Sequence, residues 1–169
     1  LHPIIDGCVQ LRNEHKLKAG DIESIALKVH PLVLELTGKK TPQVGLEGKF
    51  SVYHAAAVAL IHGAAGESQF SDAVVRDPEI VALRERVSAQ AAASIRRTEA
   101  HVTIALKDGR TYSKHVAHAL GTLQRPMSDA DLEAKFKGLA AGILTPGQTD
   151  EVIALCWQVT ALGDAGALA

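Results

Sequence analysis

The chain has 169 residues, enough for one domain with a sizeable buried core. Hydrophobic residues make up 47% of it and charged residues 22%, as in ordinary globular proteins. Because 18 Lys and Arg stand against 19 Asp and Glu, the formal net charge is −1, which excludes the broad basic surface that nucleic-acid binding needs. No apolar run is long enough to span a membrane, so we expect no membrane contact. The two distant cysteines fit a reducing environment, so we expect a cytoplasmic location.

The first half of the sequence predicts three helices and one strand. Pro3 suits the first turn of a helix, and apolar residues recur at helical spacing from there to about Lys16. Residues 21–30 alternate between apolar and polar side chains and predict a strand. A short helix is expected at 31–38 and, after a polar loop, a longer helix at 51–62 with a glycine after its last residue.

The strands of the second half are easier to recognise than its helices. Asp77 and Pro78 predict a helix start, as N-cap and first residue. Residues 86–94 predict a further strand. Two alternating runs on either side of Asp108-Gly109 predict a hairpin, because this dipeptide is the strongest short-range hairpin signal.

Two helices are expected near the C-terminus. Ser128 and Asp131 have the spacing of a capping box at the start of the first one. Thr145 and Pro146 open the second, which we expect to end near Gly163. The residues of this last helix expected to point inward are Val152, Leu155, Cys156 and Val159. Together these elements predict a single α+β domain over residues 1–169, with a largely antiparallel sheet of three to four strands packed against about five helices.

Candidate site residues gather where the helix at 51–62 begins. Lys49, Ser51, Tyr53 and His54 place an ammonium, a hydroxyl, a phenol and an imidazole within one turn. The unpaired N–H groups and the dipole of a helix start favour an anion. An ordinary capped helix with a buried tyrosine and a solvated lysine would explain the same residues.

His2 is a second candidate, because it leads the first helix. Its imidazole can act there as a base or an acid, although a purely structural role is also open. The other histidines have sufficient explanations at strand edges and helix ends. Cys8 and Cys156 lie far apart without a CxxC spacing, so we expect no zinc site, no iron–sulfur cluster and no cofactor.

Several stretches, taken in order, resemble the MmgE/PrpD family, which includes 2-methylcitrate dehydratases, cis-aconitate decarboxylases and a related epimerase. The similarity covers His2 to about Trp157 and concerns the C-terminal domain of the family only. We therefore expect this chain to be a piece of a longer protein whose large helical N-terminal domain precedes Leu1. The stretches are HPIIDGCVQL, GKFSVYHAAAVALIHGAAG, FSDAVVRDPEIVALRERV, LKDGRTYSKHVAHALGTLQRPMS and DLEAKFKGLA.

The resemblance implies an active site in the cleft between the two domains, small di- or tricarboxylate substrates, no metal cluster, and often a homodimer. The histidine of the motif matching HPIID belongs to that site, which points to His2. Many members have a tyrosine one position after Tyr53, where this sequence has His54, so Tyr53, His54 or neither of them takes the part of that tyrosine. Lys49 and Ser51 would hold a substrate carboxylate.

We therefore expect a hydro-lyase that resembles 2-methylcitrate dehydratase, with His2 as base or acid and Tyr53 or His54 assisting. A decarboxylase or epimerase of the same family is the alternative, since the same groups would serve all three reactions. A non-catalytic binding or dimerisation module is the alternative from another class. The isolated fragment is expected to be inactive without the helical domain.

Overall fold

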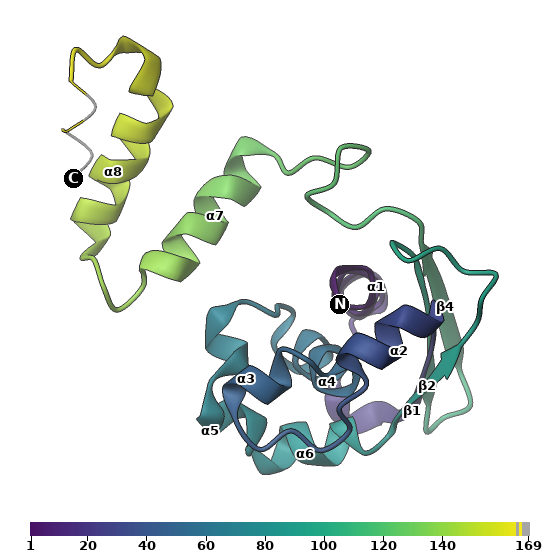
Figure 1. The fold of residues 1–169 in the computed structure, drawn as a ribbon. Helices are drawn as coiled ribbons and strands as arrows, with labels where there is room; N and C mark the ends of the chain where they lie inside the picture. Colours follow the sequence, from purple (N-terminus) through teal and green to yellow (C-terminus); the bar gives the residue numbers. More distant parts are fainter. Residues whose placement is uncertain (165, 167–169) are drawn as a thin grey trace. The chain divides into compact units, whose positions relative to one another are not determined.

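The computed structural model describes residues 1–164 and 166, and the chain forms two compact units: unit 1 is Leu1–Pro126 and unit 2 is Met127–Ala169. Figure 1 shows the ribbon. Unit 1 contains α1 (His2–His15), β1 (Ile22–Val29), α2 (Pro31–Thr37), α3 (Gly45–Gly48), α4 (Val52–His62), α5 (Asp72–Val75), α6 (Pro78–Arg84), β2 (Val87–Ala91), β3 (Ala100–Leu106) and β4 (Thr111–Val116). Unit 2 contains α7 (Asp129–Ala140) and α8 (Pro146–Trp157). Short 3₁₀ helices lie at Ala19–Asp21, Glu67–Phe70 and Val159–Ala161.

The four strands of unit 1 form one sheet in the order β2-β1-β3-β4. β1 pairs in parallel with β2 and antiparallel with β3, and β3 pairs antiparallel with β4. The connection from β1 to β2 carries α2 to α6, because parallel neighbours need a long crossover. The sheet is therefore mixed but mostly antiparallel.

Helices α1 and α4 pack on one face of this sheet, as Figure 1 shows. Alternate strand residues such as Leu27, Val102 and Ile104 are buried beneath them. α4 is buried from Val52 to Leu60 on all sides, and its alanines allow the neighbouring elements to approach closely. The core of unit 1 is therefore a layer between the sheet and the two helices α1 and α4.

Local signals in the sequence explain where the main helices begin and end. Ser51 caps α4, since its Oγ accepts a hydrogen bond from the His54 backbone N–H. Gly63 ends α4 with a φ of 70°, a left-handed conformation that glycine adopts without strain. In unit 2 the capping box of Ser128 and Asp131 is present at the start of α7. These three predictions are confirmed.

The predicted α+β class and the largely antiparallel sheet are confirmed, but the described residues form eight α-helices, more than the five or so expected. The additional helices are α3 and α5, which have four residues each and no apolar periodicity of their own. A distant contact stabilises α3, because the Gly45 N–H donates to Asp72 Oδ1 at 2.7 Å. Such short helices depend on tertiary partners, which a local pattern does not reveal.

The prediction for the last helix was wrong in two respects. α8 ends at Trp157 and not near Gly163, and a 3₁₀ turn follows it. Cys156 and Val159 are exposed, while Val152 and Leu155 are half-buried. Among the described residues of unit 2, α7 is the only other α-helix against which α8 can pack, so fewer residues of α8 are buried than the sequence suggests. No helix among residues 1–164 and 166 is long and apolar enough to cross a membrane.

Candidate functional site

Helices α1 and α4 pack side by side in unit 1. Arg12, near the end of α1, donates a hydrogen bond from Nε to the carbonyl oxygen of Leu60, near the end of α4, at 2.9 Å. The C-terminal turns of the two helices are therefore adjacent. α1 begins with the exposed His2, and α4 begins at the buried Val52.

Two of the predicted substrate-binding residues have other partners at the start of α4. Ser51 is fully buried, and its hydroxyl accepts the helix-capping bond from the His54 N–H at 3.1 Å. The Lys49 ammonium forms an ion pair with Glu67, with Nζ 2.8 Å from Oε1. Ser51 is therefore the N-cap of α4, and the charge of Lys49 is paired with a carboxylate of the same chain.

The His54 side chain lies in the interior. It is 0% exposed, and Nε2 lies 2.9 Å from the carbonyl oxygen of Gln69, so this nitrogen carries the proton and donates it. The ring meets Phe70 edge-on, with centroids 5.4 Å apart. Burial lowers the pKa of His54, which favours the neutral imidazole. Its Nδ1 is buried without a hydrogen-bond partner among the described residues.

Tyr53, in contrast, borders an open hollow in unit 1. The pocket has a volume of about 350 Å³. The Lys40 ammonium lies 6.0 Å from the centroid of the Tyr53 ring, within cation–π range. No hydrogen bond joins the Tyr53 hydroxyl to another residue in the part of the chain that the structure describes. The lining residues are Lys40, Thr41, Tyr53, Arg84, Glu85, Val87 and Ser88.

The five predicted site residues therefore differ in burial and in their partners. His2 is exposed at the start of α1, and Tyr53 is in the first turn of α4 and lines a pocket. His54 is enclosed beneath Phe70, and Lys49 and Ser51 have protein partners. The His2 imidazole and the Tyr53 phenol are therefore the two predicted groups that border solvent or a pocket.

Lys40 and Arg84 were not predicted from the sequence as neighbours of Tyr53. Lys40 follows α2, while Arg84 is the last residue of α6, so no local spacing connects either of them with α4. Arg84 is only 7% exposed, and its Nη1 donates to the Val75 carbonyl oxygen at 3.1 Å. The crossover between β1 and β2 brings the three side chains together.

The stacked pair of His101 and His115 was also missed. Their ring centroids are 4.2 Å apart with an angle of 9° between the planes, and His115 Nε2 lies 3.8 Å from a Glu99 carboxylate oxygen. Burial, and then the neighbouring His115, lower the pKa of His101. The turn at Asp108 and Gly109 would have revealed the pair, since it fixes the hairpin register that places the two residues opposite each other.

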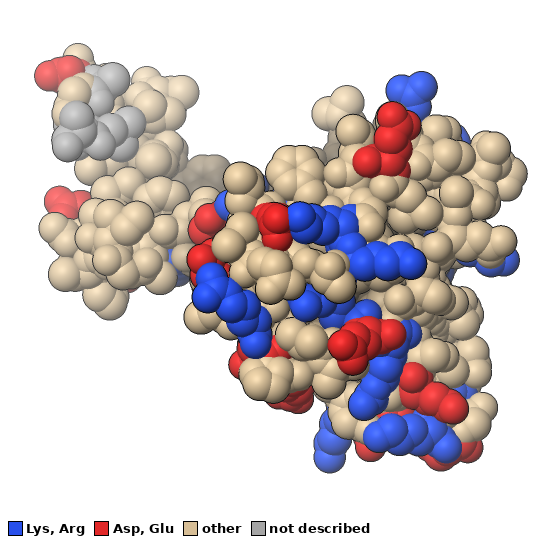
Figure 2. Space-filling view, turned by 60° about the horizontal axis from the view of Figure 1, so that its bottom comes forward, with Lys and Arg blue, Asp and Glu red and all other residues tan. Residues whose placement is uncertain are grey.

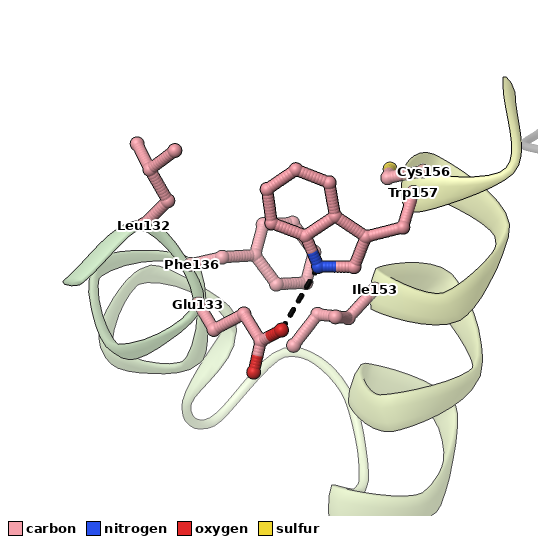
Figure 3. A pocket seen from close by; sticks show the side chains of 6 residues that line it. All are labelled: Leu132, Glu133, Phe136, Ile153, Cys156 and Trp157. Carbon is pink, nitrogen blue, oxygen red and sulfur yellow. Dashed lines mark hydrogen bonds between the residues drawn. The ribbon is translucent and has the colours of Figure 1, made fainter. Parts of the chain in front are cut away.

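Unit 2 has an apolar pocket of its own between α7 and α8. Figure 3 shows the Trp157 indole above Phe136 and Ile153, with its Nε1–H donating to Glu133 at 2.9 Å. The pocket has a volume of about 210 Å³ and no cationic side chain in its lining. It therefore lacks the groups that would hold a carboxylate.

Charges of both signs are mixed on the surface. On the face in Figure 2, Lys and Arg side chains lie among Asp and Glu side chains. This agrees with a net charge of −1 and gives that face no large area of one sign. Within the described residues, no three His, Cys, Asp or Glu side chains come together as metal ligands.

Comparison with known proteins identifies the domain. The model of the MmgE/PrpD C-terminal domain matches residues 1–159, which is nearly the whole chain. No curated protein matches the sequence. The family membership predicted from the five stretches is confirmed.

Proposed function

Because the chain belongs to the MmgE/PrpD family, through the family's C-terminal domain, we propose that it is part of a lyase that eliminates water from a small di- or tricarboxylate. The family consists in general of lyases, with dehydratases among them, and 2-methylcitrate is the substrate we propose. The helical domain of the family would supply the other wall of the active site.

Elimination of water next to a carboxylate requires two proton transfers. A base removes the proton on the carbon beside the carboxylate, and an acid protonates the hydroxyl group as it leaves. We assign the base to His2, because it is exposed at the start of α1 and imidazole is the side chain that most often acts as a general base. The acid is Tyr53, whose hydroxyl has no hydrogen-bond partner among the described residues and is adjacent to a pocket.

The relation between α1 and α4 is the observation that supports this assignment most. His2 is the first residue of α1 and Tyr53 is the second residue of α4, and the two helices pack against each other, with the Arg12–Leu60 hydrogen bond between their last turns. His54 is a weaker choice for the acid, because its ring is fully buried and its Nε2–H already donates to Gln69.

The test is a substrate panel with the full-length protein. We would incubate it separately with 2-methylcitrate, citrate and cis-aconitate, and identify the products by NMR. Loss of water from 2-methylcitrate is the expected result. Loss of carbon dioxide from cis-aconitate would show a decarboxylase of the family instead, and no conversion of any of the three acids would contradict the proposal.

A further inference from the structure

Arg84 is a buried cation without a counter-ion. Arg84 is 7% exposed. Among residues 1–164 and 166, its side chain makes one hydrogen bond, from Nη1 to the Val75 carbonyl oxygen. No carboxylate of the described chain lies within ion-pair distance of it. Burial lowers the pKa of Arg84, which reflects the cost of keeping this charge out of water.

Arg84 lines the same pocket as Tyr53. Lys40 is at the exposed side of this pocket, and Thr41 and Ser88 add hydroxyl groups. The Ser88 hydroxyl already donates to the Ile25 carbonyl oxygen at 3.2 Å, so the groups left for a ligand are two cations, a phenol and the Thr41 hydroxyl. A volume of about 350 Å³ is sufficient for a small organic acid.

We propose that this pocket is an anion-binding site for a small di- or tricarboxylate, in which Arg84 and Lys40 contact carboxylate oxygens and the Tyr53 hydroxyl donates a hydrogen bond. The choice of carboxylates among anions rests on the proposed function. Arg84 provides two or more N–H groups in one plane, a geometry that matches a carboxylate. Lys40 provides a second point charge at the pocket mouth, for a second carboxylate of the same molecule.

Glu85 is the one acidic residue of the lining, and it opposes the binding of an anion. It is exposed, and its charge raises the pKa of Arg84 from a distance without forming an ion pair with it. A bound carboxylate would replace this weak interaction with direct contacts. Neutralising Glu85 should therefore strengthen anion binding, whereas removing Lys40 or Arg84 should weaken it.

The experiment is a titration of the 169-residue chain with succinate and with citrate at constant ionic strength, followed by calorimetry. Lys40→Gln should raise the dissociation constant about threefold to fivefold, as expected for an exposed ion pair. Lys39→Gln is the matched control, because Lys39 is the neighbouring lysine, pairs with Glu47 and does not line the pocket. Glu85→Gln should lower the dissociation constant about twofold to fivefold.

Arg84→Gln should weaken binding about 10- to 100-fold, because a buried charged hydrogen bond is lost. If Arg84→Gln fails to fold by far-UV circular dichroism, the Lys40 and Glu85 variants decide the result. The site is disproved if wild type binds neither acid, or if Lys40→Gln and Lys39→Gln bind equally well. Inorganic phosphate binding at least as tightly as succinate would overturn the assignment to carboxylates.

These binding results are independent of turnover. Succinate binding that depends on Lys40 supports the site even if the full-length protein converts none of the proposed substrates. The converse result is that the full-length protein turns over a substrate while Lys40→Gln has no effect on citrate binding. That combination of results rejects the site and leaves the proposed reaction in place.

Discussion

Arg12 Nε and the carbonyl oxygen of Leu60 are joined by a hydrogen bond of 2.9 Å between the last turns of α1 and α4. Leu60 is 2% exposed, so its carbonyl has little access to water. The guanidinium also lies against Gly63, where an added Cβ would approach Arg12 Nη1 to 2.8 Å. One side chain therefore aligns the two helices that carry the proposed acid and base.

Replacing this side chain should destabilise unit 1. Arg12→Met keeps most of the aliphatic part but removes the charged donor, and we expect a loss of about 1–3 kcal/mol in the free energy of unfolding. Urea unfolding followed by far-UV circular dichroism measures it. Arg97→Met, at an exposed arginine, serves as the control and should change stability by less than about 0.5 kcal/mol. Equal effects of the two substitutions would argue against the alignment role.

His2→Ala should reduce kcat of the full-length enzyme on 2-methylcitrate about 10²- to 10⁴-fold, the usual contribution of a general base. The change is at the exposed start of α1, so the melting temperature should stay close to that of wild type. His15→Ala, at the other end of the same helix, is the matched control and should retain turnover. Wild-type kcat in His2→Ala would rule out the proposed base.

Tyr53→Phe removes one hydroxyl group and keeps the ring in the core. We expect kcat to fall about 10- to 1,000-fold, because the leaving group loses its proton donor. Tyr112→Phe removes a hydroxyl that lies 3.3 Å from Arg110 Nη1, away from the pocket, and should leave kcat unchanged. Steady-state kinetics of both variants decide the point, and a similar kcat for the two would remove Tyr53 from the mechanism.

His54 should make the stability of unit 1 sensitive to acid. Its pKa is lowered by burial, so the unfolded chain binds the proton more readily, and stability is lost as pH falls below the unfolded value of about 6.5. The contribution is at most about 1.4 kcal/mol per pH unit. His54→Phe should have a shallower dependence between pH 7 and 5 in urea unfolding.

Phe70→Leu is the control for this pH effect. It disturbs the packing around the same imidazole without removing a titratable group, so it should lower stability at every pH and keep the wild-type slope. If His54→Phe has the same slope as Phe70→Leu, another group causes the acid sensitivity.

The single tryptophan of the chain, Trp157, should report the unfolding of unit 2 separately. In the described part of unit 2 only Ala140 and Thr149 are buried, so this unit has a small core of its own. Its fluorescence transition in urea should come at a lower denaturant concentration than the circular dichroism transition of unit 1. Coincident transitions would show that the two units unfold together.

The sequence predicted those elements whose signals are local. The hairpin follows from Asp108 and Gly109, and the start of α4 from Ser51, because a turn type or a helix cap requires particular residues within a few positions. The short helix α3 was missed because it depends on Asp72, 27 residues away. The family could be predicted because five stretches match it in order.

The candidate site could be predicted from the sequence less completely than the fold. The segment from Lys49 to His54 was correctly read as a capped helix start, but burial of its side chains depends on what packs against them. Phe70 and Gln69 enclose His54, and Glu67 pairs with Lys49. All three residues belong to the 3₁₀ helix Glu67–Phe70, and the residue spacing within α4 does not predict where this segment packs.

The position of β1 in the sheet has a consequence for synthesis of the protein. β1 is complete at Val29, but its parallel neighbour β2 starts at Val87 and its antiparallel neighbour β3 at Ala100. On the ribosome, both hydrogen-bonding edges of this strand therefore stay open while some sixty residues are added. A nascent chain stalled in that interval exposes an unpaired apolar strand, which is the kind of segment that chaperones bind and that aggregates form around.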